Sequence, residues 1–439
     1  MRTSSPGRQG IEASIDRDAS PVMFSLRFLS IPLLVVAATA GPVYWALPEG
    51  LSLARSLGIV VGWAGCGLLL ASLLLMLRES RLAQGLGGLE RMYRWHHSVG
   101  MAAYVLLLAH PLFLALDAWP ENRLLAWQTL SPFGQGWPVW LGWLSLLLLM
   151  AGLAVTFEER IPYRIWRWLH VGLGLAVLFG LLHLVLLGID EPVWPILGLA
   201  ALFLGLRIVR EDFGLAARPY IVHAVIPVAE GIVEISLKPL ADAFKVNPGQ
   251  FALVAFFAGP TFRGCGEFHP FTISAVGAEG EIRFGVKALG DCTRKIQSIE
   301  PGVMARVHGA FGDFLADRPA APQLWVAGGI GITSFLSHLR AGPVNQQTLL
   351  LYLYRAEAEA AFLLELQALA ENDPKLSLQA VASGQTVPDL NTLLPDAPSL
   401  AHHECYLCGP PGMVAGLRKA LKDRGIAPRH IHFENFEFR

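Results

Sequence analysis

The chain has 439 residues, of which 53% are hydrophobic and only 16% are charged. Charged residues make up roughly 25% of a typical soluble protein, so this low fraction, with a mean hydropathy of +0.46, indicates membrane segments. The net charge is −1, which gives a nucleic-acid partner no electrostatic support. The five cysteines lack iron–sulfur spacing, which argues against a built-in ferredoxin domain and against a disulfide framework.

Residues 1–21 are polar and rich in serine, arginine and aspartate, and we expect them to form a disordered cytoplasmic tail. They lack the layout of a cleavable signal, because the apolar run that follows them is as long as a membrane span. Six apolar runs follow, each close to the roughly 20 residues that a helix needs to cross the hydrocarbon core. These runs cover about residues 24–46, 52–77, 95–117, 137–157, 165–188 and 192–210.

Arginines gather on one side of the predicted bundle. They precede the first span, lie between spans two and three and between spans four and five, and follow span six. The other side has Arg55, Arg123 and mostly acidic residues. The positive-inside rule therefore predicts a multi-pass protein of the inner (cytoplasmic) membrane with both termini in the cytoplasm. Buried helices of a large soluble protein are the alternative, but the alternating arginine flanks argue against it.

Two of the predicted spans carry histidines at both ends. They read WHHSVGMAAYVLLLAH at residues 95–110 and LHVGLGLAVLFGLLH at residues 169–183. Ionisable side chains inside membrane spans are costly and usually functional. The alternative is that these are core histidines bonded to nearby carbonyl groups, but two matched pairs at two depths favour ligands.

The two spans run in the same direction, so their histidines form an inner and an outer level. His96 or His97 lies at the depth of His170, and His110 lies at the depth of His183, about 20 Å further out. Helical phase places His96 nearer than His97 to the face of His110. The same phase argument aligns His170 and His183 less well, so helix tilt or local rewinding has to bring them to one cavity.

Each level offers two imidazoles from different helices, which suits axial ligation on opposite faces of a planar haem. Zinc or copper would need three or four close ligands. Without a CxxCH motif the haem would be held noncovalently. Four glycines leave room for a flat ring or serve ordinary close helix packing: Gly100, Gly172, Gly174 and Gly180. We therefore predict two b-type haems, with the metal ligands His96, His110, His170 and His183.

The second half of the chain changes character. From Tyr220 to about Phe314, short β-rich runs separated by turn residues predict a small antiparallel barrel. From Gln323 onwards, strands and helices alternate, which predicts a parallel, doubly wound α/β domain. The expected fold class is thus multi-domain: a six-helix transmembrane bundle, then the barrel, then the α/β domain. The expected boundaries are 1–21 for the tail, 22–212, 218–317 and 320–439.

Two motifs in this half carry chemistry. Gly-Gly-Ile-Gly-Ile-Thr at residues 328–333 lies between a strand and a helix, where glycines let the backbone approach a pyrophosphate. A tight turn without a ligand is the alternative. His-Pro-Phe-Thr at residues 269–272 precedes Gly-Asp-Cys-Thr at residues 290–293, which opens a helix and suits a phosphate. Taken alone, His-Pro-Phe-Thr is also compatible with a proline-fixed turn in a barrel.

In order and in motifs, residues 50–439 resemble the ferric reductase and NADPH oxidase family, in its bacterial type. These are membrane dihaem cytochromes fused to a ferredoxin-reductase-like flavin and pyridine-nucleotide module. His96, followed one turn later by Gly100, resembles the first histidine of the family's third-helix pair. Trp168-Leu169-His170 with His183 resembles the fifth-helix pair.

The resemblance implies site residues for each cofactor. For FAD it implies His269, Pro270, Phe271 and Thr272 near the isoalloxazine, and Lys287, Gly290 and Thr293 at the pyrophosphate. For NADPH it implies Gly328, Gly329, Gly331 and Thr333 at the pyrophosphate, and Cys408, Gly409 and Pro410 near the nicotinamide. Arg355 lies where the family often holds the 2′-phosphate, which favours NADPH, with NADH as the alternative. The terminal FENFEFR resembles the aromatic terminus that stacks on the flavin, with Phe438 preferred to Phe436, so the expected reacting centre contains Thr272, Cys408 and Phe438.

The expected function is that of a transmembrane oxidoreductase. Electrons would pass from cytoplasmic NADPH through FAD and two haems to an extracytoplasmic acceptor, either a ferric chelate or dioxygen. No EF-hand pattern precedes the first span, so calcium gating is not expected, and the outer loop at 118–136 lacks a cysteine that would cap the outer haem. The alternatives are an electron conduit to a periplasmic partner protein, and a non-catalytic six-span protein with a nucleotide-sensing domain. No obligatory protein partner is evident.

Overall fold

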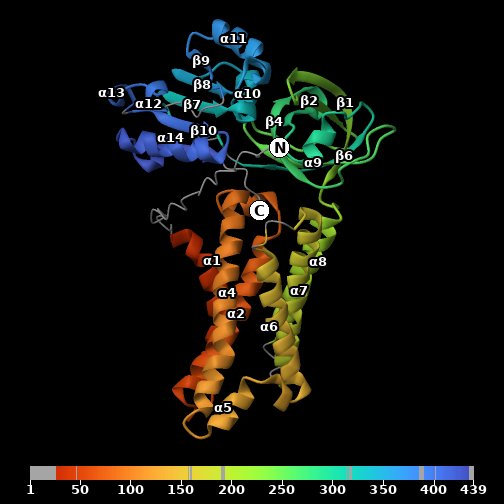
Figure 1. Cartoon of the computed structure of the whole chain (residues 1–439), viewed down its shortest axis with the longest axis vertical. Helices are drawn as coiled ribbons and strands as arrows, with labels where there is room; N and C mark the ends of the chain where they lie inside the picture. Colours follow the sequence, from red (N-terminus) through yellow and green to blue (C-terminus); the bar gives the residue numbers. More distant parts are fainter. Residues whose placement is uncertain are drawn as a thin grey trace, which may run out of the picture.

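The computed structural model describes residues 26–45, 47–156, 158, 161–188, 193–312, 314–315, 319–384, 390–400 and 402–434. The predicted tail at 1–21 and the aromatic candidates Phe436 and Phe438 lie outside these residues. Figure 1 shows a long helical part and, next to one end of it, a barrel and a sheet domain side by side.

The helical part consists of long apolar helices. They are α1 (Leu26–Trp45), α2 (Leu53–Leu75), α4 (Leu89–Ala118), α6 (Trp137–Thr156), α7 (Tyr163–Leu186) and α8 (Val193–Leu206). The short α3 (Ser80–Gly85) precedes α4, while α5 (Arg123–Thr129) lies at the end of the bundle far from the barrel, followed by the 3-10 turn η1 (Pro132–Gly134). The π-helical η2 (Arg207–Asp212) continues α8 towards the barrel. Within the bundle, α2 packs mainly against α4 and α1, and α6 packs against α7.

Five of the described helices are long and apolar enough to cross a membrane: α2, α4, α6, α7 and α8 continued to Glu211. Six spans are expected from the sequence, and five of them correspond to these helices. The remaining expected span coincides with α1, a 20-residue helix at Leu26–Trp45. Large apolar side chains such as Val105 (61% exposed) and Leu147 (55% exposed) point away from the bundle, as lipid contact requires.

The barrel is closed and antiparallel. Its strands are β1 (Arg218–Ala229), β2 (Ile232–Pro239), β3 (Phe251–Phe256), β4 (His269–Val276), β5 (Ile282–Lys287) and β6 (Met304–Phe311), in the order β1-β2-β5-β4-β3-β6. The 3-10 turn η3 (Ala278–Gly280) links β4 to β5, and helix α9 (Asp291–Ile296) follows β5. Inward side chains of β3, β4 and β5, including Phe256, Ile273 and Phe284, fill the core. Full closure leaves the small sheet without an exposed edge.

The last domain is a five-stranded parallel sheet. Its strands are β7 (Gln323–Gly328), β8 (Thr348–Tyr354), β9 (Leu376–Ala382), β10 (Glu404–Cys408) and β11 (Ile431–Glu434), in the order β11-β10-β7-β8-β9. Its helices and helical turns are η4 (Gly329–Gly331), α10 (Ile332–Ala341), η5 (Glu357–Glu359), α11 (Leu363–Asn372), α12 (Leu390–Leu393), α13 (Ala397–Leu400), α14 (Pro411–Asp423) and η6 (Pro428–His430).

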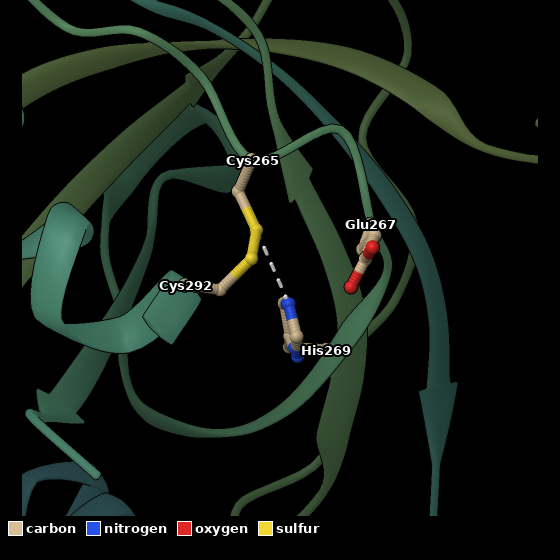
Figure 2. A group of neighbouring side chains, drawn as sticks. All are labelled: Cys265, Glu267, His269 and Cys292. Carbon is tan, nitrogen blue, oxygen red and sulfur yellow. Dashed lines mark hydrogen bonds between the residues drawn. A yellow bond between two sulfur atoms is a disulfide. The ribbon is translucent and has the colours of Figure 1, made fainter. Parts of the chain in front are cut away.

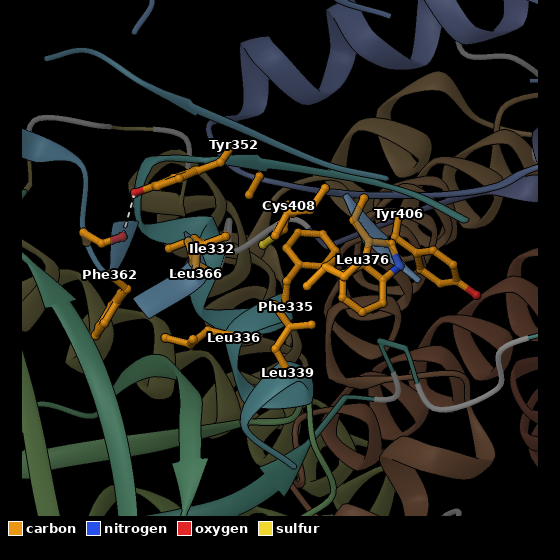
Figure 3. Packing of buried hydrophobic residues seen from close by; sticks show 14 of the residues in the cluster. Ile332, Phe335, Leu336, Leu339, Tyr352, Phe362, Leu366, Leu376, Tyr406 and Cys408 are labelled. Atoms are coloured by element: carbon orange, nitrogen blue, oxygen red, sulfur yellow. Dashed lines mark hydrogen bonds between the residues drawn. The ribbon is translucent and has the colours of Figure 1, made fainter. Parts of the chain in front are cut away.

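Both faces of this sheet are buried. Along β7, Trp325 and Ala327 join the cluster that contains Phe335 of α10, shown in Figure 3, while Leu324 and Val326 join the cluster on the other face. This period-two alternation places helices on both sides of the sheet, as in doubly wound folds. The predicted order of an apolar helical part, an antiparallel barrel and a parallel nucleotide-binding type of domain is confirmed.

A shared hydrophobic cluster seats the barrel on the helical part. Leu75 of α2, Leu86 and Met92 of the α3–α4 region pack in one cluster with Leu253 of β3 and Phe311 of β6. This contact holds β3, and through it the neighbouring β4, next to the end of the bundle where α4 begins. The barrel is therefore held next to the inner histidine level rather than tethered only through η2.

Candidate functional site

The inner histidines meet in a cavity inside the helical part. The ring centroids of His96 on α4 and His170 on α7 lie 5.8 Å apart. Both line a cavity of about 540 Å³ to which α2, α4, α6, α7, α8 and η2 contribute side chains, among them Ser72, Thr156 and Arg207. Ligand pockets are commonly roughly 300–1,000 Å³, so the space suits a small-molecule cofactor.

Neighbouring helices fix the protonation pattern of the inner histidines. His96 Nδ1 lies 2.8 Å from Ser72 Oγ and 3.1 Å from the Ser72 carbonyl oxygen on α2. His170 Nδ1 lies 3.1 Å from Thr156 Oγ1 on α6, and that hydroxyl donates to the Gly152 carbonyl at 2.7 Å. Each Nδ1 therefore faces an acceptor and carries the proton, which leaves a lone pair on each Nε2. Metal-ligating histidines typically have this arrangement.

The outer histidines repeat the pattern. His110 Nδ1 donates to the Gly58 carbonyl oxygen of α2 at 2.7 Å, and His183 Nδ1 donates to the Pro138 carbonyl oxygen of α6 at 2.8 Å. A Cβ atom at Gly62 would lie 2.7 Å from His110 Nδ1, so a glycine is needed for this ring to rest against α2. The sequence reading missed these acceptors, which lie far from the histidines along the chain.

His97 differs from His96 in its exposure and in its hydrogen bonding. It lines the same cavity, but it is exposed, and no hydrogen bond fixes its ring among the residues that the structure describes. Its ring centroid is 5.7 Å from that of His96. The geometry thus favours His96 as the inner residue, in line with the helical-phase argument.

The glycines at positions 100, 172, 174 and 180 were expected either to leave room for a haem ring or to allow close helix packing, and the structure bears on both roles. A Cβ at Gly174 would overlap the side chain of Leu204 on α8, and one at Gly180 would lie 3.1 Å from Ser145 Oγ on α6, so both permit close helix packing. Gly100 and Gly174 line the inner cavity. A Cβ at Gly172 would meet nothing within 4 Å among the described residues.

Strand β4 carries the His-Pro-Phe-Thr motif between β3 and β5. Phe271 and Thr272 are buried, with 9% and 7% exposure, and Thr272 pairs with Phe251 on β3. His269 and Pro270, at the start of the strand, are half-buried. Burial lowers the pKa of His269, while the nearby Glu267 opposes that shift. The imidazole is therefore neutral at neutral pH.

The segment after β5 lies close to the nucleotide domain. Lys287 Nζ is 2.7 Å from Glu359 Oε2 in η5, and this hydrogen bond lowers the pKa of Glu359. Thr293 Oγ1 accepts hydrogen bonds from the backbone N–H groups of Leu289 and Gly290, both at 2.9 Å. These bonds fix the turn that brings the chain from β5 into α9.

The cysteine pattern argued against a disulfide framework, and the structure contains one disulfide. Cys265, in the loop before β4, is bonded to Cys292 in α9, with a Cα–Cα distance of 5.6 Å. Figure 2 shows this disulfide beside His269 and Glu267. Metal and iron–sulfur motifs are recognised from cysteines a few residues apart, whereas Cys265 and Cys292 are 27 residues apart in sequence. The barrel topology brings the two cysteines together.

In the nucleotide domain the two glycine-containing turns touch each other. A Cβ at Gly331 would overlap the Cys408 carbonyl group, and one at Gly409 would lie 3.0 Å from Gly328 Cα. Glycines are therefore required for the turns after β7 and β10 to approach this closely. Gly329 has a φ of +53°, and Thr333 Oγ1 donates to the Ile330 carbonyl at 2.8 Å. The motifs at residues 328–333 and 408–410 thus meet at the carboxyl ends of adjacent parallel strands, the usual ligand edge.

Two functional candidates that the sequence analysis missed lie around Cys408. Ser334 Oγ is 3.4 Å from Cys408 Sγ and 3.3 Å from Glu434 Oε2. Burial raises the pKa of the Cys408 thiol, and Glu434 raises it further, so the thiol stays protonated at neutral pH. Both residues follow recognisable signals, because Ser334 comes directly after the glycine turn and Glu434 pairs with Cys408 across β10 and β11.

Cys405 and Cys408 have CxxC spacing on β10, yet they are not bonded to each other. Cys405 belongs to one hydrophobic cluster of the sheet and Cys408 to the other, because residues three apart on a strand point to opposite faces. Arg355 follows β8 and is exposed, and its carbonyl oxygen accepts from the Gly384 N–H at 3.0 Å. It lies close enough to Glu359 to contribute to the lowered pKa of that carboxylate.

Comparison with known protein families matches three segments in order. A model described as the ferric reductase like transmembrane component matches residues 61–181. A model for an FAD-binding domain matches residues 220–310, and one for an oxidoreductase NAD-binding domain matches residues 325–419.

Three similar proteins each match about half of this chain or less. The ferredoxin–NAD(P)+ reductase component of the naphthalene 1,2-dioxygenase/salicylate 5-hydroxylase systems of Ralstonia sp is 29% identical over 211 residues, which are 45% of this chain and 62% of that protein. An NADPH oxidoreductase of Mycobacterium tuberculosis is 28% identical over 204 residues, covering 44% and 53% of the two chains. This chain thus spans less than two thirds of the length of either relative. The structure of an Amycolatopsis cytochrome P450 reductase has a TM-score of 0.43 at 23% identity, covering 50% of this chain and 69% of that one.

Fold, motifs and matches together support a class of protein: a multi-pass membrane oxidoreductase with an FAD-binding and an NAD-binding domain. The order of the three matches is that of a ferric reductase-like fusion. These matches favour an oxidoreductase over the non-catalytic alternative, a membrane protein that only senses nucleotide.

Proposed function

We propose that this protein passes electrons from cytoplasmic NADPH through FAD and two b-type haems to an acceptor on the other side of the inner membrane, either a ferric chelate or dioxygen. The observation that carries the proposal is the arrangement of four histidines at two levels, each with Nδ1 bonded to α2 or α6. When bound, FAD would accept a hydride and the haems would carry single electrons.

The inner site fits a haem. His96 on α4 and His170 on α7 line a common cavity, and with Nδ1 of each bonded to a neighbouring helix, Nε2 of each would be the atom that holds the haem iron. Arg207 lines the same cavity and supplies a cation suited to a carboxylate such as a haem propionate. The role of this chain is to hold the ring planes, exclude water and keep both imidazoles in one tautomer.

At the outer level, His110 and His183 hold the corresponding positions on the same two helices, α4 and α7. The hydrogen bonds to the Gly58 and Pro138 carbonyl oxygens leave Nε2 of each imidazole available, as at the inner level. His110 and His183 would hold the outer haem, and when bound that haem would supply single electrons to the acceptor.

The nucleotide sites follow from the paired turns. Gly328, Gly329, Gly331 and Thr333 would hold the NADPH pyrophosphate, and Cys408, Gly409 and Pro410 would lie at the nicotinamide. Their support is the close approach of the two turns at the carboxyl ends of β7 and β10. Arg355, at the end of the adjacent β8, offers an exposed guanidinium for a 2′-phosphate.

The flavin site would use β4 and the segment after β5. His269, Pro270, Phe271 and Thr272 would line the isoalloxazine, and Lys287, Gly290 and Thr293 would lie at the pyrophosphate. The hydrogen bond between Lys287 and Glu359 joins this segment to the nucleotide domain, so the flavin and nucleotide sites lie on facing parts of the two domains. Phe438 remains our expected flavin-stacking residue.

A reduced-minus-oxidised spectrum of the purified protein tests the proposal as a whole. NADPH titrated anaerobically should bleach the flavin and then produce the spectrum of a bis-histidine haem, with NADH less effective. A matched set of variants sharpens the result: His110→Ala with His183→Ala should lose one haem equivalent, while His97→Ala should retain two. Wild-type haem content in the double variant, or protein without a haem spectrum, would contradict the proposal.

The product distinguishes the two acceptors. Ferrous iron can be trapped with a chelator, and superoxide can be followed by cytochrome c reduction that superoxide dismutase abolishes. A ferric reductase gives chelator-trapped iron that the dismutase leaves unchanged. If both free acceptors are reduced only slowly while the haems reduce quickly, the electron conduit to a periplasmic partner protein is favoured instead.

A further inference from the structure

The Cys265–Cys292 disulfide joins the two segments that flank the proposed flavin site. Cys265 lies in the loop between β3 and β4, four residues before the His-Pro-Phe-Thr motif, and Cys292 lies in α9, directly after Gly290 and Asp291. The loop that it closes contains β4 and β5, the hairpin that carries both parts of the predicted flavin site. We propose that this disulfide is a reversible thiol switch that clamps the flavin site when it is oxidised and loosens it when it is reduced.

The local backbone presents Cys265 towards α9. Gly264 and Gly266 on either side of it both have positive φ values, +75° and +64°, which side-chain-bearing residues rarely adopt. The N–H groups of Cys265 and Gly266 both donate to the Phe256 carbonyl at 3.0 Å, so this turn is anchored to the end of β3. The cysteine is thus held at the tip of a fixed turn, and the disulfide extends that order to α9.

The disulfide is accessible and has a proton acceptor next to it. Cys265, Cys292, Glu267 and His269 are all half-buried, and their ligand-type atoms lie within 4.8 Å of one another. Figure 2 shows His269 against the disulfide, with its Nε2 3.3 Å from Cys265 Sγ. An imidazole at this position can hold the proton that a thiol releases during exchange. The other described cysteines, Cys66, Cys405 and Cys408, are free and lie elsewhere.

The reducing cytoplasm favours a disulfide that can be reversibly reduced over a permanent one. An NAD(P)H-binding domain works where NAD(P)H is, and in the proposed orientation that is the reducing cytoplasm. Disulfides there are usually transient, and catalytic or redox-sensing. The cytoplasmic location of this disulfide rests on the proposed function and its membrane orientation.

Reduction of the Cys265–Cys292 disulfide needs a thiol that donates electrons and protons. In the reducing direction, two thiols of a low-molecular-weight thiol or a dithiol protein become the donor's disulfide. The Cys265–Cys292 bond breaks, and two electrons and two protons are transferred to its two sulfur atoms. In the oxidising direction, a small disulfide takes the electrons and protons back. Once the bond is broken, the loop before β4 and α9 lose their covalent link. FAD must then restrict more of their motion when it binds, and this entropic cost weakens FAD binding.

Thiol counting on the full-length protein in detergent is the first test. Protein poised in an oxidising glutathione buffer, then denatured and alkylated, should show three reactive cysteines. Protein poised in a reducing dithiol buffer should show five, and Cys265→Ser should show four in both buffers. Five reactive thiols in the oxidised wild type would overturn the proposal. So would a cross-link that the dithiol buffer fails to reduce, or a zinc ion released on alkylation, which would make the four residues a metal site.

FAD binding is the second test, and it does not depend on the haems or on any acceptor. Reduction should raise the dissociation constant of wild-type FAD by about tenfold, measured from the fluorescence of released flavin. Cys265→Ser should bind FAD weakly in both buffers, whereas Cys66→Ser, a matched cysteine change in α2, should respond like the wild type. Equal FAD affinity of the wild type in both buffers would overturn the switch while leaving the proposed electron path untouched.

Discussion

The tautomer of each intramembrane histidine is set by a residue that is not on its own helix. The ligand candidates lie on α4 and α7, while the groups that accept from Nδ1 lie on α2 and α6. A histidine free to choose its tautomer would present Nε2 as a ligand only part of the time. The hydrogen bonds of α2 and α6 therefore prepare the imidazoles for a metal before it arrives.

Ser72→Ala tests this role at the inner level. The substitution removes the hydroxyl 2.8 Å from His96 Nδ1 and leaves only the carbonyl contact. Loss of such an outer partner typically weakens metal binding by about 10–100-fold, so we expect faster loss of the inner haem and a shifted midpoint potential. Redox titration of the haem spectrum measures both effects.

The control for this experiment is Thr129→Ala. Thr129 lies on α5, outside the inner cavity, and donates to the Leu125 carbonyl of its own helix. It should leave haem content and potential unchanged. A wild-type haem potential and retention in Ser72→Ala would contradict the proposed function of the hydrogen bond.

Glu359 gives the domain interface a pH dependence with a definite sign. The hydrogen bond from Lys287 lowers the pKa of Glu359 below its ordinary value of 4.5. A carboxylate with a lowered pKa stabilises the folded state above that ordinary value, and this contribution is lost as the pH falls through the folded-state pKa. Both side chains are about one-quarter exposed, so solvent screening limits the effect to below about 1 kcal/mol.

We therefore expect Glu359→Gln to lower the thermal stability of the FAD-loaded protein slightly at neutral pH. The difference from wild type should vanish as the pH falls through the lowered folded-state pKa, because the wild-type carboxylate then becomes neutral too. Glu357→Gln, on the same turn but bonded to Tyr354, is the matched control. A stability difference that grows towards acid pH would reverse the assigned sign.

The sequence predicts some of the site residues well and others not at all. The histidine ligand candidates and the glycine turns are local patterns, so their positions were readable. Ser72, Thr156 and the Gly58 carbonyl were not, because nothing local distinguishes a serine, a threonine or a glycine that happens to face a histidine on another helix. Cys265 and Cys292 were missed for the same reason, since only barrel closure brings them together.

At the scale of elements, Arg340 of helix α10 joins the nucleotide domain to the barrel. Arg340 contacts Glu365 of α11 at 2.7 Å and also pairs with Glu234 of β2 and the hydroxyl of Ser274 on β4. Glu234 is 5% exposed, and its carboxylate is paired with the Arg340 guanidinium. The two carboxylates raise the pKa of Arg340 against the effect of burial, and the guanidinium stays charged.

Arg340→Met should strongly destabilise the contact between the two domains. Removing one partner of a buried ion pair leaves the other charge uncompensated, which typically costs about 3–5 kcal/mol. Hydrogen–deuterium exchange of the full-length protein should show faster exchange in α10 and β2. Arg283→Met, which breaks the more exposed pair with Glu281, should cost under about 1 kcal/mol. Equal exchange in the two variants would show that the Arg340 network does not hold the domains together.

Among elements, the long periodic segments were predictable and their irregular joints were not. The barrel and the parallel sheet follow from period-two and strand–helix patterns, and both are confirmed. Five of the six expected spans are long apolar helices among the described residues, and the first expected span coincides with α1. The π-helical η2, which turns the chain from α8 into β1, leaves no sequence signature that we recognised.

For the whole molecule, the proposed electron path requires the barrel to stay docked on the bundle. The shared hydrophobic cluster places Leu253 of β3, the neighbour of Pro270 in the flavin motif, against side chains near the start of α4. His96 lies two turns further along the same helix. Docking therefore sets the distance between the proposed flavin site and the inner histidines, and a loosened interface should slow only the step between them.

Leu86→Asp isolates that step. Leu86 is 8% exposed in the shared cluster and belongs to neither the histidine sites nor the proposed flavin site. A buried, unpaired carboxylate there should open the interface, because a charge without a partner is costly to bury. We expect NADPH to reduce the flavin, and a soluble dye through it, at the wild-type rate, while haem reduction slows by about tenfold or more, a change that corresponds to 1.4 kcal/mol.

Stopped-flow spectra that follow flavin and haem separately would measure the two rates, with Leu240→Asp as the matched control because Leu240 is 51% exposed on the barrel. Unchanged haem reduction in Leu86→Asp would show that docking through this cluster does not control electron transfer. Parallel loss of dye reduction would instead place the damage inside the reductase module. Only a selective loss of haem reduction fits a path that enters the bundle at His96.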